Sequence, residues 1–189
     1  MQHPVKIISA YYNKHNILPV QTIEYMEYTL ISLWNEWIKI IIYWIFFVFL
    51  KQNTSFLFIL LILYPIRWIS GGFHAKTFLG CFIYSFFAIL FLIFLPPILP
   101  CPIIPFSLFL FVLCLLTYSY VPSTPTFRPI TNKKNIYILQ CLYITLIIIW
   151  IIILNLITHP NKYTSIGFYT LLFQVIQLFA SKKGGNSYV

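Results

Sequence analysis

Acidic residues are almost missing from this sequence of 189 residues, which contains three glutamates, no aspartate and twelve lysines and arginines. Charged residues make up 8% of the chain, whereas soluble domains carry roughly 25%. Because so few charges cannot cover the surface of a soluble monomer of this size, the sequence excludes that class. A lipid environment needs no such covering, since the hydrocarbon core of a bilayer is itself apolar.

Cysteine is scarce as well, and no two cysteines form a CxxC pair. The four cysteines are Cys81, Cys101, Cys114 and Cys141. Neither a disulfide framework nor a zinc site is expected from this spacing, and no metal or cofactor is predicted. The bases stand singly between apolar runs, which argues against nucleic acid binding and favours lipid headgroups as their partners. The polar start of the chain, MQHPVK, predicts no cleaved targeting peptide.

Hydrophobic residues fill 60% of the chain and fall into six long runs, which polar or proline-rich breaks separate. Because a helix of about 20 residues crosses a bilayer, this pattern predicts an all-α polytopic membrane protein with six transmembrane helices. Residues 17–28 mix apolar and acidic positions and predict an N-terminal amphipathic helix at the membrane surface. Residues 1–189 are expected to form one membrane-embedded domain. The expected spans are 30–50, 54–69, 77–95, 103–121, 136–158 and 163–180.

The basic residues are unevenly distributed between the two sides that six spans define. Nine of the twelve fall on the side shared by the N-terminus, the second and fourth connections and the C-terminus, and two fall on the other. By the positive-inside rule, both termini are therefore expected in the cytoplasm. The remaining base, Lys39, lies in the first run one turn after Glu36, and the two are expected to form a structural ion pair. The nine bases are Lys6, Lys14, Arg67, Lys76, Arg128, Lys133, Lys134, Lys182 and Lys183.

Residues 67–81, RWISGGFHAKTFLGC, bring together the residue types that acyl transfer needs. A cysteine nucleophile requires a nearby base, which His74 can supply to Cys81 near neutral pH. On an unbroken helix their spacing of seven residues would leave them about 10 Å apart along the axis. Gly71 and Gly72 permit the chain to fold back, so that His74 could approach Cys81 near the start of the next helix. The amides and dipole of that helix start would favour a thiolate and an oxyanion. The alternative is an interfacial histidine and a packing cysteine.

The same segment resembles the signature of the accessory gene regulator B (AgrB) family, membrane-embedded cysteine endopeptidases of bacterial quorum sensing. Members share an Arg, then Gly-x-His-Ala, then a Cys seven residues after the His. The matching residues here are Arg67, Gly72, His74, Ala75 and Cys81. Residues 120–130, YVPSTPTFRPI, resemble the Tyr-Ala-Pro loop of the family, with Val121 in the place of Ala. The resemblance covers essentially the whole chain, and its specificity lies in the first motif.

The resemblance implies a function, a site and a location. Cys81 and His74 would be the catalytic residues, and Arg67, Gly71 and Gly72 would bind substrate or shape the site. The substrate would be a short propeptide of the AgrD type, whose acidic C-terminal tail is cleaved through an acyl-thioester before the peptide closes to a thiolactone or lactone. The protein would span the bacterial cell membrane, as a homodimer, with its site on the cytoplasmic side. The alternative is a small transporter or a scaffold for peptide export without enzymatic activity.

Overall fold

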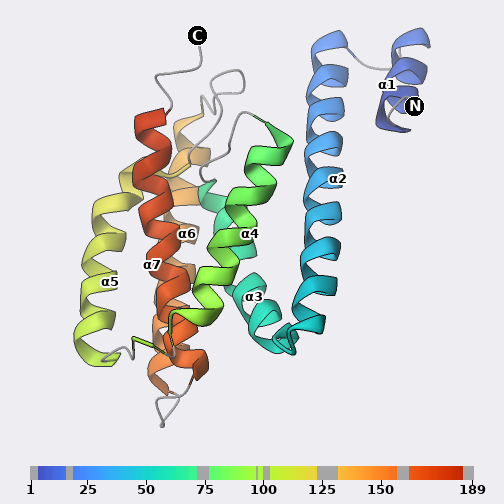
Figure 1. Ribbon diagram of the computed structural model, residues 1–189. Helices are drawn as coiled ribbons and strands as arrows, with labels where there is room; N and C mark the ends of the chain where they lie inside the picture. Colours follow the sequence, from blue (N-terminus) through green and yellow to red (C-terminus); the bar gives the residue numbers. More distant parts are fainter. Residues whose placement is uncertain are drawn as a thin grey trace. The chain divides into compact units, whose positions relative to one another are not determined.

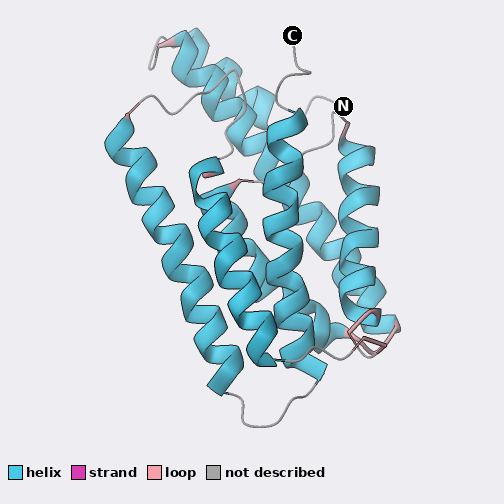
Figure 2. Ribbon diagram, turned by 90° about the vertical axis from the view of Figure 1, so that its left-hand side faces the viewer, coloured by secondary structure: helices cyan, strands magenta, loops and turns pink. Residues whose placement is uncertain are grey.

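A computed structural model describes residues 4–15, 19–71, 77–96, 98–99, 103–122, 132–156 and 162–184. The secondary structure of these residues consists of helices (Figure 2), so the all-α prediction is confirmed for this part of the chain. In chain order they are α1 (Pro4–Lys14), α2 (Val20–Phe49), α3 (Asn53–Ser70), α4 (Phe78–Phe94), α5 (Ile103–Thr117), the 3-10 turn η1 (Tyr118–Tyr120), α6 (Lys133–Leu156) and α7 (Lys162–Gly184) (Figure 1). The chain divides into two compact units, residues 1–50 and residues 51–189.

The first unit consists of α1 packed on α2. Helix α2 runs for 30 residues without a break, because no proline or glycine interrupts it after Pro19. The amphipathic segment expected at 17–28 is not a helix of its own, since its residues from Val20 onward form the start of the same helix as the first apolar run. Its location at the membrane surface stays a prediction. The expected ion pair is confirmed, as the Lys39 ammonium lies 2.5 Å from the Glu36 carboxylate one turn away.

One end of the second unit gathers the ends of several helices. The side chain of Gln174, in the C-terminal half of α7, reaches the Gly71 carbonyl directly after α3. The ring of Tyr120, in the turn after α5, lies 5.5 Å from that of Phe179 near the end of α7. The end of α3, the turn after α5 and the last part of α7 therefore lie together. This end of the unit is named the motif end, because the segment RWISGGFHAKTFLGC begins there.

The opposite end of the second unit holds the starts of α3 and α7. Lys162, at the start of α7, donates a hydrogen bond to Gln52, which precedes α3. The Tyr169 hydroxyl donates to the Leu99 carbonyl, which belongs to the connection between α4 and α5. The second and fourth connections therefore leave from the motif end and the third from the other end, as the charge distribution requires. That both termini lie in the cytoplasm stays a prediction.

The core of the second unit forms around α7, which contacts α3, α4, α5 and α6. Its buried residues are Ile62, Ile66, Leu110, Cys114, Val121, Tyr143, Ile147, Leu154, Phe168, Leu171, Val175 and Leu178. Gly167 lets α7 approach α6 closely, because a Cβ atom at this position would lie 2.6 Å from Leu154 Cδ2. Small residues at such crossings are typical of helices that pack within membranes.

The outer faces of the helices are apolar, as lipid contact requires. Among the described residues, four helices are long and apolar enough to cross a bilayer: α2, α3, α6 and the part of α7 up to Ser181. Helix α4 has 17 residues, which at 1.5 Å each give about 26 Å against a hydrocarbon thickness of about 30 Å. Its exposed side chains, Phe87 and Phe91 among them, are apolar nonetheless. Each predicted run contains an apolar helix, and the count of six spans stays a prediction.

Candidate active site

The site begins where α3 ends, at Gly71. The Gly71 amide donates to the Arg67 carbonyl at 2.9 Å and closes the last turn of the helix. Gly71 has φ 73° and ψ −158°, a conformation that only glycine adopts readily. Gly71 therefore ends α3 in a conformation that suits glycine, and the expected fold-back of the chain over Gly71 and Gly72 stays a prediction. Arg67 lies half-buried in this last turn.

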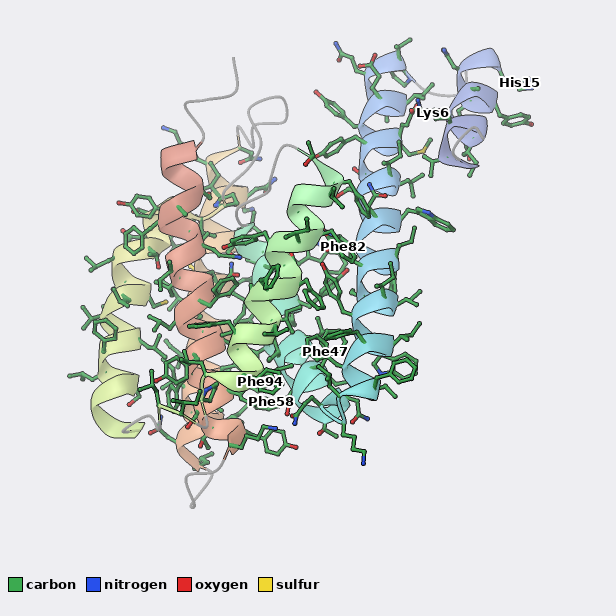
Figure 3. The ribbon with its side chains drawn as sticks, in the orientation of Figure 1. Lys6, His15, Phe47, Phe58, Phe82 and Phe94 are labelled. Carbon is green, nitrogen blue, oxygen red and sulfur yellow. The ribbon has the colours of Figure 1, made fainter. Side chains whose placement is uncertain are left out.

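Cys81 lies at the start of α4, close to its N-terminus (Figure 3 labels its neighbour Phe82). Thr77 caps this helix, because its hydroxyl oxygen accepts the Gly80 amide at 3.0 Å and its carbonyl accepts the Cys81 amide at 3.0 Å. The Cys81 amide is thus already paired, and the first-turn amides that the helix itself leaves unpaired are those of Phe78 and Leu79. The expected helix dipole still acts on Cys81, whose side chain is 7% exposed.

Gly72 and His74 lie outside the described residues. The approach of His74 to Cys81 therefore stays a prediction. The structure does describe the two flanks of this segment, Gly71 directly after α3 and Thr77 directly before α4.

Two glutamines of α7 contact the helices on either side of this segment, one at the end of α3 and one in the first half of α4, and the sequence did not predict either contact. Gln174 Nε2 donates to Ser70 Oγ at 2.8 Å and to the Gly71 carbonyl at 3.1 Å. Gln177 Nε2 donates to the Tyr84 hydroxyl at 3.3 Å, one turn after Cys81 on α4. The only sequence signal was a pair of amide side chains three residues apart in an apolar run. Thr77 was missed too, although a threonine directly before an apolar run is a known N-cap signal.

The other cysteines differ in position. Cys114 is buried in the core of the second unit, as a packing cysteine is expected to be, and Cys141 is exposed on α6. Cys101 lies outside the described residues. Among the residues whose placement is described, Cys81, Cys114 and Cys141 form no disulfide. No group of three His, Cys or acidic side chains in the described ranges could hold a metal ion.

Fold and site together define a helical membrane protein with a cysteine at the start of an apolar helix, directly after a glycine-terminated helix. The chain belongs to the accessory gene regulator B (AgrB) family, whose model matches residues 5–178. It is also similar to a curated protein of Clostridium beijerinckii named as AgrB-like. The two are 29% identical over 173 residues, which cover 90% of this chain and 84% of that protein. No solved structure matches the chain.

Proposed function

We propose that the chain is a membrane-embedded cysteine endopeptidase, which removes the C-terminal tail of a quorum-sensing propeptide and promotes its cyclisation. The observation that carries the proposal is the placement of Cys81 at the start of α4, after the turn at Gly71. Membership of the AgrB family supports it, because the family model matches residues 5–178 and this range includes the segment from Arg67 to Cys81. Cys81 and His74 are the proposed catalytic residues.

The proposed reaction has two steps on one thiol. His74 accepts the thiol proton, and the Cys81 thiolate attacks the carbonyl carbon of the peptide bond before the tail. The C–N bond breaks, His74 returns the proton to the leaving amine, and the peptide remains bound as a thioester. A cysteine or serine side chain of the same peptide then gives its proton to His74 and attacks the thioester carbonyl. The Cys81 thiolate leaves and takes that proton back from His74. The product is a thiolactone or lactone, because holding this nucleophile close favours ring closure over hydrolysis.

Basic residues near the motif end support an acidic tail as the leaving group. Arg67 lies in the last turn of α3, and Lys133 and Lys134 begin α6. The fourth connection joins the turn after α5 to α6, so these two lysines belong to the motif end. A guanidinium can bind a carboxylate through two hydrogen bonds, which makes Arg67 the preferred candidate. Gly71 and Gly72 shape the site by letting the chain turn between α3 and α4.

The proposed location follows from the same charges. The motif end would face the cytoplasm of a bacterial cell, where a newly made propeptide first meets the membrane. The protein would be a multi-pass protein of the cell membrane, and its partners would be the propeptide, the lipid bilayer and a second copy of the chain.

The proposal is tested with purified protein in proteoliposomes and a synthetic propeptide of the AgrD type, which has an internal cysteine or serine and an acidic C-terminal tail. We expect Cys81→Ala and His74→Ala to abolish release of the tail, measured by mass spectrometry, while the helical content is unchanged. Cys141→Ala is the matched control, because this cysteine is exposed on α6 and should leave cleavage intact. Release of the tail by Cys81→Ala would refute the proposal.

A further inference from the structure

The two glutamines of α7 are unusual because both carboxamides are buried but only partly paired. Gln174 and Gln177 are each 1% exposed. Their nitrogens donate hydrogen bonds, whereas neither side-chain oxygen has a partner among the described residues. A buried polar atom without a partner lowers stability, because it has lost its hydrogen bonds to water. Packing alone would be served better by a methionine or a leucine at either position.

The hydrogen bonds of these two amides indicate a role for the glutamines other than packing. Gln174 holds the Gly71 carbonyl, three residues before His74, and Gln177 holds Tyr84, three residues after Cys81. Both glutamines lie on one face of α7, because residues three apart in a helix are neighbours. The segment that carries His74 and Cys81 is therefore tied at both flanks to the same helix, about 100 residues further along the chain.

We infer that Gln174 and Gln177 are positioning residues, which hold the end of α3 and the start of α4 so that His74 can act on Cys81. The inference rests on the proposed function for the roles of His74 and Cys81. It assigns the two amides no contact with substrate. The unpaired oxygens of the two amides cost free energy. In return, the hydrogen bond from Gln174 fixes the direction in which the chain leaves Gly71.

Thiol reactivity tests the inference without any substrate. The rate at which iodoacetamide modifies Cys81 is measured from pH 5 to pH 10 by mass spectrometry of the Cys81 peptide. His74→Ala defines the profile of a thiol without its base. Gln174→Met and Gln177→Met each remove one tie, and Gln140→Met is the matched control. Gln140 lies on α6 and donates to the Val121 carbonyl at 3.0 Å, rather than to Ser70, Gly71 or Tyr84.

We expect both methionine variants to slow alkylation at neutral pH and to move the pH profile toward that of His74→Ala. The kcat for propeptide cleavage should fall about tenfold to a hundredfold, as misplacement of a catalytic group by about 1 Å does, with KM little changed. The melting temperature should stay the same or rise, since the unpaired oxygens are removed. Gln140→Met should keep the wild-type profile. Unchanged pH profiles in both Gln174→Met and Gln177→Met, or an equal shift in Gln140→Met, would overturn the inference.

Tyr84→Phe provides a milder variant if a methionine variant does not fold. It removes the acceptor of Gln177 but keeps the ring, which stacks on Phe173 with centroids 6.3 Å apart. We expect Tyr84→Phe to shift the profile in the same direction as loss of the Gln177 amide. A wild-type profile in this variant would contradict the role of Gln177.

The outcomes separate this inference from the proposed function. If alkylation of Cys81 depends on His74 and both glutamines but the wild type cleaves no propeptide, the positioning role holds and the peptidase proposal fails. If the wild type cleaves the propeptide and the glutamine variants match it in rate and pH profile, the positioning role is wrong and the peptidase proposal stands.

Discussion

Gly71→Ala should destabilise the protein, and the backbone dihedral angles at Gly71 set the size of the effect. With φ 73° and ψ −158°, Gly71 lies in a region that is essentially restricted to glycine. Holding an alanine there costs about 1–3 kcal/mol. The backbone cannot relax cheaply, because the Gly71 amide donates to Arg67 and its carbonyl accepts from Gln174. Such a cost lowers the ratio of folded to unfolded protein by a factor of roughly 5 to 150.

The assay is reversible unfolding in mixed micelles, followed by circular dichroism and extrapolated to the absence of denaturant. Gly80→Ala is the matched control, because Gly80 is helical in α4 and does not have a positive φ. There, alanine should leave stability unchanged or raise it by about 0.5–1 kcal/mol. If Gly71→Ala still folds, we expect the chain to leave α3 in another direction. Cleavage of the propeptide should then fall as well. Equal stability and activity of Gly71→Ala and the wild type would refute the reasoning.

Two further substitutions test local features of α4 and α7. Thr77→Ala removes the cap of the Gly80 amide and should lower the free energy of unfolding by about 1 kcal/mol in the same micelle assay, whereas Thr77→Ser should keep most of it. A wild-type value for Thr77→Ala would show that the cap contributes nothing. Gly167→Val should cost about 1–3 kcal/mol, because its Cβ would meet Leu154, and Leu154→Ala should recover part of the loss in the double variant. Failure of that rescue would locate the strain elsewhere.

Composition and apolar runs predicted the helical class and the position of most helices. Each of the six predicted spans contains one helix, because hydrophobic length marks a membrane helix strongly. The continuity of α2 was not predicted, since acidic residues early in the helix suggested a surface segment. Yet polar residues do not end a helix, and no proline or glycine follows Pro19 within it. The helix α1 was not predicted either. Its 11 residues alternate with a helical period, but a segment this short is not an apolar run that could span a membrane.

The sequence predicted those features of the candidate site that depend on residues close in sequence. It did not predict the features that depend on how the helices pack. The glycine end of α3 and the Glu36–Lys39 pair both follow from residues close in sequence, and the ion pair is confirmed. The contacts of Gln174 and Gln177 join residues about 100 positions apart. Apolar periodicity says which face of a helix is buried but not which neighbour covers it. Such contacts come only from the packed bundle.

The central claim is that Cys81 carries the peptide as a thioester. It is tested most directly by mixing the protein with a propeptide whose internal nucleophile is replaced by alanine, quenching in acid and weighing the intact protein. We expect an adduct with the mass of the propeptide minus its tail. Hydroxylamine should remove it, the Cys81 peptide should contain it, and His74→Ala should not form it. Release of the tail with the adduct on another residue, or by the Cys81→Ala variant, would contradict the account.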